Sequence, residues 1–345
     1  MRVRRSLGAA IALALLASVS LGSGASAIAA PTTDLVSAFT DLRASAVWPV
    51  QGGVADAMTS TFGPRIKVST GLYDWHRGID LDAPEGTPVL ATLDGTFFDI
   101  TTYADGGLTV ILKHTFPTPV LFQGKTLSSF YTFHMHLSAV APELEAAQAA
   151  GLRPSVAKGS VIGAVGHSGT AVDDHLHFEV RVGTPYSLEW QLAHPTSVYG
   201  ANTWGFDPHV HPMLLATPAA THGMALTLTQ APGKRDGIVR FSADDDQPLL
   251  DRVLVTIVRK SDGRVMATHT LALDERIGFD ATTNAALDTP TTTKPYFSPQ
   301  PFGTRSPYVT DVVIPKAFVG TAYGTKYRTT ITATDIWGRA VQLAW

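Results

Sequence analysis

Cysteine is absent from the chain of 345 residues. Its absence excludes disulfide bonds, a thiol nucleophile and a lipid anchor attached through cysteine. A His-Glu-x-x-His motif, in which a glutamate beside two metal ligands serves as general base, is absent as well. Any catalytic metal must therefore be held by histidine, aspartate or glutamate in another arrangement.

Long apolar stretches are absent after the beginning of the chain. Three arginines precede the apolar residues 7–21, and the small residues 25–27 fit a cleavage site, as would 27–29, where alanines flank Ile28. This pattern predicts a signal peptide over residues 1–30 and a secreted protein of the cell envelope, the periplasm or the extracellular space. An uncleaved anchor is the alternative, but the apolar run is shorter than the ~20 residues of a membrane span. No integral membrane segment is expected after cleavage.

Basic residues are fewer than acidic ones, with 26 lysines and arginines against 29 aspartates and glutamates. The formal net charge is −3. Residues 1–30 contain three arginines and no acidic residue, so their removal changes the net charge from −3 to −6. Such a balance argues against nucleic acid as a partner. Hydrophobic residues make up 45% of the chain and charged residues 16%, which is typical of a folded globular protein rather than a disordered one.

The length suits two domains, and two regions of short β-prone runs divide the chain accordingly. We predict an N-terminal segment over 31–47 with one short helix, followed by a β domain over 48–220, where glycine and proline separate the runs. Residues 141–150 are the one helical patch in that domain. Strand signals return over 224–345, with an Asp-Gly hairpin at 262–263. The fold class is therefore all-β, and the second domain is expected to be a small Ig-like β-sandwich.

A strand over residues 174–180 carries two histidines. Alternation places His175, His177 and Glu179 on one face and the apolar residues between them on the other. Neutral imidazole is the commonest metal ligand, and a buried sheet rarely gives a face to two histidines unless something binds them. The pair alone is weak evidence for a metal.

A second group lies upstream, where Gly78 permits a turn that folds His76 back toward Asp80. With His177, these side chains would supply three ligands and leave one position open for water, as in catalytic zinc sites. Taken singly, His76 reads as a surface histidine beside Arg77, and Asp80 as a turn-capping carboxylate. Their occurrence together with the His-x-His strand favours a metal site.

Four blocks of the sequence, in order, resemble the lysostaphin/LytM-type zinc metalloendopeptidases. The blocks are STFGPR (60–65), HRGIDLDAPEGTPV (76–89), FYTFHMHLS (130–138), and VIGAVGHSGT (161–170) followed by HLHFEVR (175–181). The resemblance covers residues 48–212. It implies the two-sheet, mostly antiparallel β fold of that family (the duplicated hybrid motif) with a groove over one sheet. It also implies hydrolysis of peptide bonds in bacterial peptidoglycan through a zinc-activated water.

Position by position, the resemblance makes His76, Asp80 and His177 the ligands of Zn²⁺ and makes His136 and His175 the catalytic histidines. Zinc lowers the pKa of its water from ~16 to ~7. A histidine that titrates near neutrality can take the released proton and deliver it to the leaving amine. We interpret Glu179 as support for a ligand or as groove lining rather than as the base.

Other histidines compete for these roles. His134 precedes His136 by two residues, so alternation places both on one face and makes His134 the alternative to His136. His167 is expected to line the groove rather than bind zinc. His209 and His211 form a third His-x-His pair, but prolines bracket it and argue against a metal site. Residues 115–129 are expected to form a loop at one wall of the groove.

Two other functions fit parts of the pattern. A non-catalytic relative that binds the wall or activates another hydrolase would lose metal ligands, whereas this chain keeps all three together with both histidines. An exported binding protein with a structural metal would need a fourth protein ligand to close the site.

Overall fold

The computed structural model describes residues 32–52, 58–66, 73–187, 208–215, 224–243, 250–272, 279–280, 285–286, 293–299, 308–336 and 338–345. The predicted signal peptide over 1–30 lies outside these residues, as does the stretch 216–223 between the two predicted domains. In the described part of the chain, no helix is long and apolar enough to cross a membrane.

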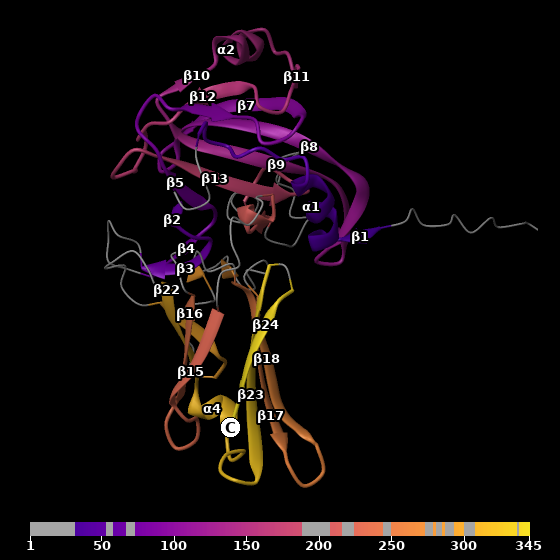
Figure 1. The fold of residues 1–345 in the computed structure, drawn as a ribbon, viewed down its shortest axis with the longest axis vertical. Helices are drawn as coiled ribbons and strands as arrows, with labels where there is room; N and C mark the ends of the chain where they lie inside the picture. The colour runs from indigo at the N-terminus through magenta and orange to yellow at the C-terminus, as the bar shows by residue number, and fades with distance from the viewer. Residues whose placement is uncertain are drawn as a thin grey trace, which may run out of the picture. The chain divides into compact units, whose positions relative to one another are not determined.

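A sheet of nine described strands organises the first half of the chain (Figure 1). Its main path runs through β11 (Ser155–Val156), β7 (Gly95–Tyr103), β8 (Gly107–Phe122), β9 (Lys125–Leu137), β13 (His175–Val182), β5 (Ile79–Asp82) and β2 (Met58–Ser60). Neighbours along this path are antiparallel. β1 (Thr33–Asp34) adds to β8 in parallel, and β14 (His209–Val210) adds to β13 antiparallel.

Smaller elements complete this half of the chain. A three-stranded sheet contains β10 (Ala139–Val140), β12 (Val161–Ala164) and β6 (Pro88–Leu90), and a hairpin pairs β3 (Gly63–Ile66) with β4 (Tyr73–His76). The 3-10 helix η2 (Pro212–Leu214) follows β14. Since most pairings are antiparallel and strands predominate, the prediction of an all-β fold is confirmed.

Two short helices lie where the sequence predicts them. α1 (Leu35–Arg43) begins after Asp34, whose carboxylate accepts a hydrogen bond from the backbone N–H of Ser37 at 2.9 Å and so caps the helix. It buries Phe39 edge-on against Phe116 and Phe130. α2 (Pro142–Ala149) has proline in its first turn, where no N–H is needed, and lies against β7 (Figure 1).

The prediction of a loop over residues 115–129 is wrong. These residues continue β8 and β9 as a hairpin whose turn residues, Gln123 and Gly124, both have positive φ, at 45° and 75°. The prolines at 117 and 119 lie where the pairing register shifts between Thr115 and Val120, so no regular ladder needs their missing N–H groups.

Two four-stranded antiparallel sheets follow after residue 224. One has the order β15 (Met224–Gln230), β16 (Gly237–Ala243), β22 (Tyr308–Ile314) and β21 (Tyr296–Pro299). The other has the order β18 (Val265–Ala272), β17 (Leu250–Arg259), β23 (Tyr327–Asp335) and β24 (Ala340–Ala344). A two-stranded pair, β19 (Phe279–Asp280) with β20 (Ala285–Ala286), and α4 (Lys316–Val319) complete the described elements.

Both of these sheets bury alternate residues, such as Val239 and Phe241 in one and Val253, Val255 and Ile257 in the other. This alternation is expected of a β-sandwich. Each described sheet draws its strands from one side of residues 216–223 only. The division into domains at the stated boundaries remains a prediction.

Candidate metal centre

Strand β13 presents a polar row on one face, as its alternation predicts. His175, His177, Glu179 and Arg181 lie on this face, whereas Leu176, Phe178, Val180 and Val182 are buried in the apolar core. The core residues fix the strand in register, so the polar row cannot turn away from its neighbours. Any chemistry at this strand is therefore carried by the polar face.

Strand β5 brings Asp80 opposite this row. In the antiparallel pairing of β5 with β13, Asp80 is the direct partner of His177. His76 ends β4, and only Arg77 and Gly78 separate it from β5, so the His76 ring lies near Asp80, with its Nε2 3.2 Å from Oδ1. The predicted fold-back of His76 toward Asp80 is present.

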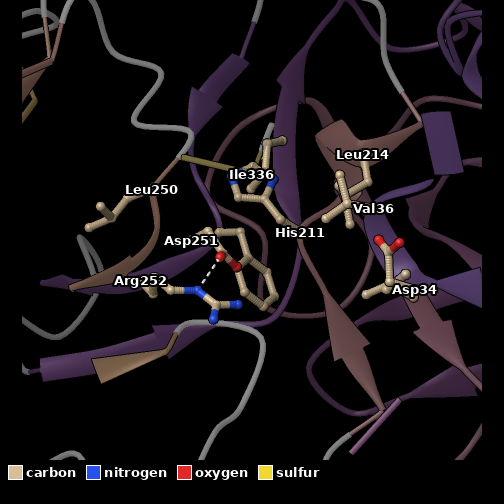
Figure 2. A pocket seen from close by; sticks show the side chains of 10 residues that line it. Asp34, Val36, His211, Leu214, Leu250, Asp251, Arg252 and Ile336 are labelled. Carbon is tan, nitrogen blue, oxygen red and sulfur yellow. Dashed lines mark hydrogen bonds and ion pairs between the residues drawn. The ribbon is translucent and has the colours of Figure 1, made fainter. Parts of the chain in front are cut away.

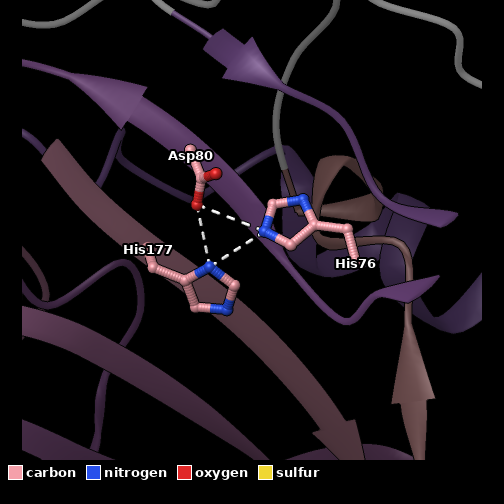
Figure 3. Close-up of side chains that lie close together, drawn as sticks. All are labelled: His76, Asp80 and His177. Carbon is pink, nitrogen blue, oxygen red and sulfur yellow. Dashed lines mark hydrogen bonds and ion pairs between the residues drawn. The ribbon is translucent and has the colours of Figure 1, made fainter. Parts of the chain in front are cut away.

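Three donor atoms form a small triangle at this point (Figure 3). The Nε2 atom of His76 lies 3.0 Å from Nδ1 of His177 and 3.2 Å from Oδ1 of Asp80, and the last two atoms are 2.8 Å apart. Zinc binds such donors tetrahedrally at about 2.0–2.2 Å, which separates neighbouring donor atoms by about 3.3 Å. The triangle is slightly tighter than that, and these side chains form a site that can hold a metal ion.

Hydrogen bonds set the tautomers of both imidazoles. Nδ1 of His76 donates to the backbone oxygen of Thr61 at 2.8 Å, and Nε2 of His177 donates to Oε1 of Glu179 at 3.0 Å. The lone pairs of His76 Nε2 and His177 Nδ1 therefore face each other beside the Asp80 carboxylate. Arg65 pairs with the other oxygen of Asp80 at 3.2 Å, and a metal ion among the three electron-rich atoms fits this donor set.

Burial and neighbouring charges shift the pKa values of all three side chains of the triangle. Burial lowers the pKa of His76 to about 4, and the charge of Arg65 adds to this. Burial also opposes a charge on His177, but its hydrogen bonds to Asp80 and Glu179 raise its pKa to about 9. Burial would raise the pKa of Asp80, yet His76 and His177 hold it well below its usual value. To hold a metal ion through Nδ1, His177 would have to be neutral, because a metal-binding ring nitrogen must be deprotonated.

Gly78 has to be glycine because of close approach. A Cβ atom at this position would lie 2.5 Å from the backbone oxygen of Phe178, 2.7 Å from Nε2 of His177 and 2.9 Å from Cγ of Glu179. Any side chain would therefore push into the contact between His177 and Glu179. The sequence pointed to this glycine for its turn, whereas the structure shows that it is needed for space.

His136 reaches the centre through a β-bulge in β9. Leu137 pairs with Leu108 and His134 with Val110, so two residues of β9 oppose one residue of β8. His136 has a φ of 61° there, and its ring lies 4.8 Å from that of His175 and 5.8 Å from that of His177, centroid to centroid.

The prediction that His134 shares the face of His136 is wrong, because the bulge breaks the alternation. The fully buried His134 ring lies 5.3 Å from the ring of Phe178 on the core side, and its Nδ1 donates to the backbone oxygen of Val110 at 3.3 Å. The structure therefore brings His136, and not His134, to the candidate ligands.

Two segments in close contact, residues 105–107 and residues 168–169, position His136. Its backbone N–H donates to the oxygen of Gly106 at 2.8 Å, and its ring Nδ1 donates to the oxygen of Ser168 at 2.7 Å. A Cβ atom at Gly107 would overlap the backbone of Ser168, and one at Gly169 would overlap the oxygen of Asp105. The two segments can lie this close only because both positions are glycine.

His136 and His175 present the same ring atom. Nδ1 of His175 donates to the backbone oxygen of Asp173 at 2.8 Å, so in both rings Nε2 carries the lone pair. Nε2 of His175 lies 3.6 Å from Oδ1 of Asp80. Burial lowers the pKa of His136 to about 4, below the near-neutral value expected from the sequence. His136 is therefore an unprotonated proton acceptor at pH 7.

Sequence reasoning missed one contact of the site, which comes from β14. His209 pairs with Arg181 across the strands, and its Nε2 lies 3.3 Å from Oε2 of Glu179. His211 instead accepts a hydrogen bond from the N–H of Met213 at 3.2 Å and caps η2. Neither histidine belongs to the metal-binding triangle, and no spacing in the sequence could have linked His209 to Glu179.

A second group of metal-binding residue types, Glu85, His167 and Asp174, lies at the surface. Nδ1 of His167 is 2.6 Å from Oδ1 of Asp174, and the side chains are 59% and 39% exposed. The hydrogen bond to Asp174 raises the pKa of His167. An exposed ion pair accounts for this arrangement without a metal. That His167 lines the groove remains a prediction.

The structure also contains a small pocket, shown in Figure 2. His211, Asp251 and Arg252 share it with apolar residues such as Leu214 and Ile336. Nε of Arg252 donates to Oδ2 of Asp251 at 2.7 Å, so these two charged side chains pair with each other. No candidate ligand or catalytic histidine lines this pocket.

Comparison with known proteins matches residues 74–187 to the model of Peptidase family M23. The DD-carboxypeptidase/endopeptidase Mpg of Neisseria meningitidis is 33% identical over 125 residues, which are 36% of this chain and 24% of that protein. An uncharacterized metalloprotease of Haemophilus influenzae is 32% identical over 127 residues, which are 36% of this chain and 22% of that protein. This chain thus spans about a quarter of the length of the curated relatives it matches, 24% and 22%.

Solved structures with similarity include a zinc-containing peptidase from Vibrio cholerae, at 27% identity and a TM-score of 0.28, covering 36% of this chain and 33% of that one. The catalytic domain of lysostaphin from Staphylococcus simulans is 21% identical with a TM-score of 0.30, covering 47% of this chain and 91% of that one.

Proposed function

Because residues 74–187 of this chain belong to peptidase family M23, we propose that the protein is a secreted zinc endopeptidase that hydrolyses peptide bonds of bacterial peptidoglycan. The observation that carries the proposal is the buried triangle of His76, Asp80 and His177 with His136 and His175 beside it. The name of the Neisseria relative, a carboxypeptidase and endopeptidase, supports the reaction class.

Each side chain has a role in this proposal. His76, Asp80 and His177 would hold zinc, which when bound lowers the pKa of a water molecule and polarises a carbonyl group. His175 would take the proton of the attacking water at Nε2. That proton would then pass to the leaving amine by way of His136, whose unprotonated Nε2 can accept a proton and give it up. Their Nδ1 atoms are held by the backbone oxygens of Asp173 and Ser168, so both rings keep this orientation.

The open coordination position favours catalysis over a structural metal. Among the described residues, the group that can hold the ion has three members, whereas structural zinc sites close all four positions. The same observation counts against a non-catalytic relative, because such a protein has no need to keep the three ligands and both histidines together.

Chelation is expected to abolish hydrolysis reversibly. The purified full chain should contain about one zinc ion per molecule and release soluble peptides from purified peptidoglycan, because the fourth position is free for water. Removal of the metal should stop release, and added zinc should restore it. Metal content and mass analysis of the released fragments, before and after chelation, measure both points.

Zinc bound at full occupancy without release of fragments from walls of any cross-link type would contradict the proposed hydrolysis and favour the non-catalytic reading. An inactive protein whose metal a chelator cannot remove would favour the alternative of a binding protein with a structural metal.

A further inference from the structure

Beyond the three candidate ligands, β13 buries two more charged side chains. Glu179 is 4% exposed and Arg181 is 7% exposed. Charged groups are rarely buried to this extent unless they are paired and hydrogen-bonded. The proposed reaction uses neither of them directly, so their presence beside the metal centre needs a reason.

Three neighbours hold the carboxylate of Glu179. Its Oε1 accepts the hydrogen bond from Nε2 of His177 at 3.0 Å. Its Oε2 lies 2.6 Å from an Nη atom of Arg181 and 3.3 Å from Nε2 of His209. Both oxygens are therefore occupied, and the carboxylate cannot rotate without losing a contact.

Arg181 is itself fixed. Its second Nη atom donates to the backbone oxygen of Pro185 at 2.5 Å, and its guanidinium group lies 3.7 Å from the centroid of the Phe133 ring. A guanidinium held by a carbonyl, a carboxylate and an aromatic face has little freedom left. It thus forms a rigid support for Glu179.

We propose that Glu179, clamped by Arg181 and His209, is the positioning residue of the metal centre. It holds the Nε2–H of His177, so that Nδ1 of the same ring faces His76 and Asp80. Histidine ligands commonly donate their second N–H to a carboxylate, which fixes the tautomer and the ring orientation. The inference rests on the metal centre of the proposed function and adds to it the residues that hold this centre in shape.

The geometry also explains why Glu179 does not act as the general base. One of its oxygens is engaged by His177 and the other by Arg181 and His209, and the side chain is buried. A base needs a free lone pair directed at the water it deprotonates. The Nε2 atoms of His136 and His175 offer one, and Glu179 does not.

The test compares zinc affinities of full-length variants by competition with a chromophoric chelator. Glu179→Asp keeps the charge that Arg181 needs but withdraws the carboxylate from His177 by one methylene. Glu179→Gln keeps the length and removes the charge. Both should bind zinc ~10–100-fold more weakly, the usual effect of losing such a support. The visible spectrum of the cobalt-substituted protein should also change, since it reports ligand geometry independently of activity.

Matched controls separate positioning from folding. Asp311 of β22 is another carboxylate paired with an arginine, because its Oδ1 accepts a hydrogen bond from Nε of Arg240 in β16 at 2.9 Å. Asp311→Asn removes this charge and should leave zinc affinity unchanged. His209→Phe keeps the ring volume and removes the contact with Glu179. It should weaken zinc binding less than Glu179→Asp does, because Arg181 still holds the carboxylate.

Wild-type zinc affinity and an unchanged cobalt spectrum in folded Glu179→Asp would overturn the inference. If Glu179→Gln does not fold, Glu179→Asp decides alone. Unchanged affinity in His209→Phe would overturn the part assigned to His209. Since the readout is metal affinity, a wild-type protein that binds zinc but cuts no peptidoglycan contradicts the proposed function only, whereas one that binds no zinc overturns both.

Discussion

Replacing His177 with alanine should remove both the metal and the peptidase activity. Its Nδ1 is one corner of the donor triangle, 3.0 Å from His76 Nε2 and 2.8 Å from Asp80 Oδ1, and three ligands leave no redundancy. The substitution also removes the hydrogen bond that Oε1 of Glu179 accepts from Nε2 of His177. We expect zinc affinity to fall by more than the ~10–100-fold that the loss of a supporting hydrogen bond causes.

Metal analysis and hydrolysis of a soluble muropeptide check this expectation. His76→Ala and Asp80→Ala should behave in the same way, since each removes another corner of the triangle. His269→Ala, at a histidine of β18, serves as the control and should keep both zinc and activity. Stoichiometric zinc retained by purified His177→Ala would contradict the ligand assignment.

Replacing His136 with alanine should leave zinc and the fold in place and lower kcat by ~10²–10⁴, the usual contribution of a positioned proton-transfer group. The His136 ring lies beside the rings of His175 and His177 but is not part of the donor triangle. Its removal should therefore not remove the metal. His175→Ala should show the same combination. Zinc content and single-turnover kinetics on a muropeptide measure the two effects separately.

His134 provides the matched control. It is a neighbouring histidine of the same strand, fully buried on the core side, and its Nε2 has no hydrogen-bond partner among the described residues. His134→Leu should therefore fold and keep most of its turnover. Near-normal turnover in His136→Ala together with an inactive His134→Leu would show that the wrong histidine of this pair has been assigned.

Local patterns in the sequence predicted much of the site. The alternation of β13 placed His175, His177 and Glu179 on one face, because a single apolar face must be buried and the period of a strand is two. The short spacing from His76 to Asp80 across Gly78 predicted that these two side chains meet, and they do. Both predictions concern residues that are close in sequence, where backbone geometry alone constrains the result.

Predictions failed where pairing between distant strands decides the outcome. The bulge that turns His136 toward His175 depends on how β9 aligns with β8, and strict alternation put His134 on the wrong face. His209 reaches Glu179 because β14 pairs with β13. The loop predicted over residues 115–129 is strand, and the register shift that accommodates the prolines of β8 belongs to the pairing and not to the local sequence.

The left-handed backbone at His136 favours residues that would stabilise the fold but could not carry a proton. At a φ of 61°, a residue other than glycine or asparagine is strained by ~1–2 kcal/mol. Alanine is usually more stable than glycine in a strand, by ~0.5–1 kcal/mol, but at this position the order should reverse. Thermal unfolding of His136→Gly and His136→Ala, which both lack the ring, measures the difference, and a more stable alanine variant would exclude the strain. Selection for heat resistance alone would therefore drive position 136 toward glycine or asparagine and leave a robust protein without its proton carrier.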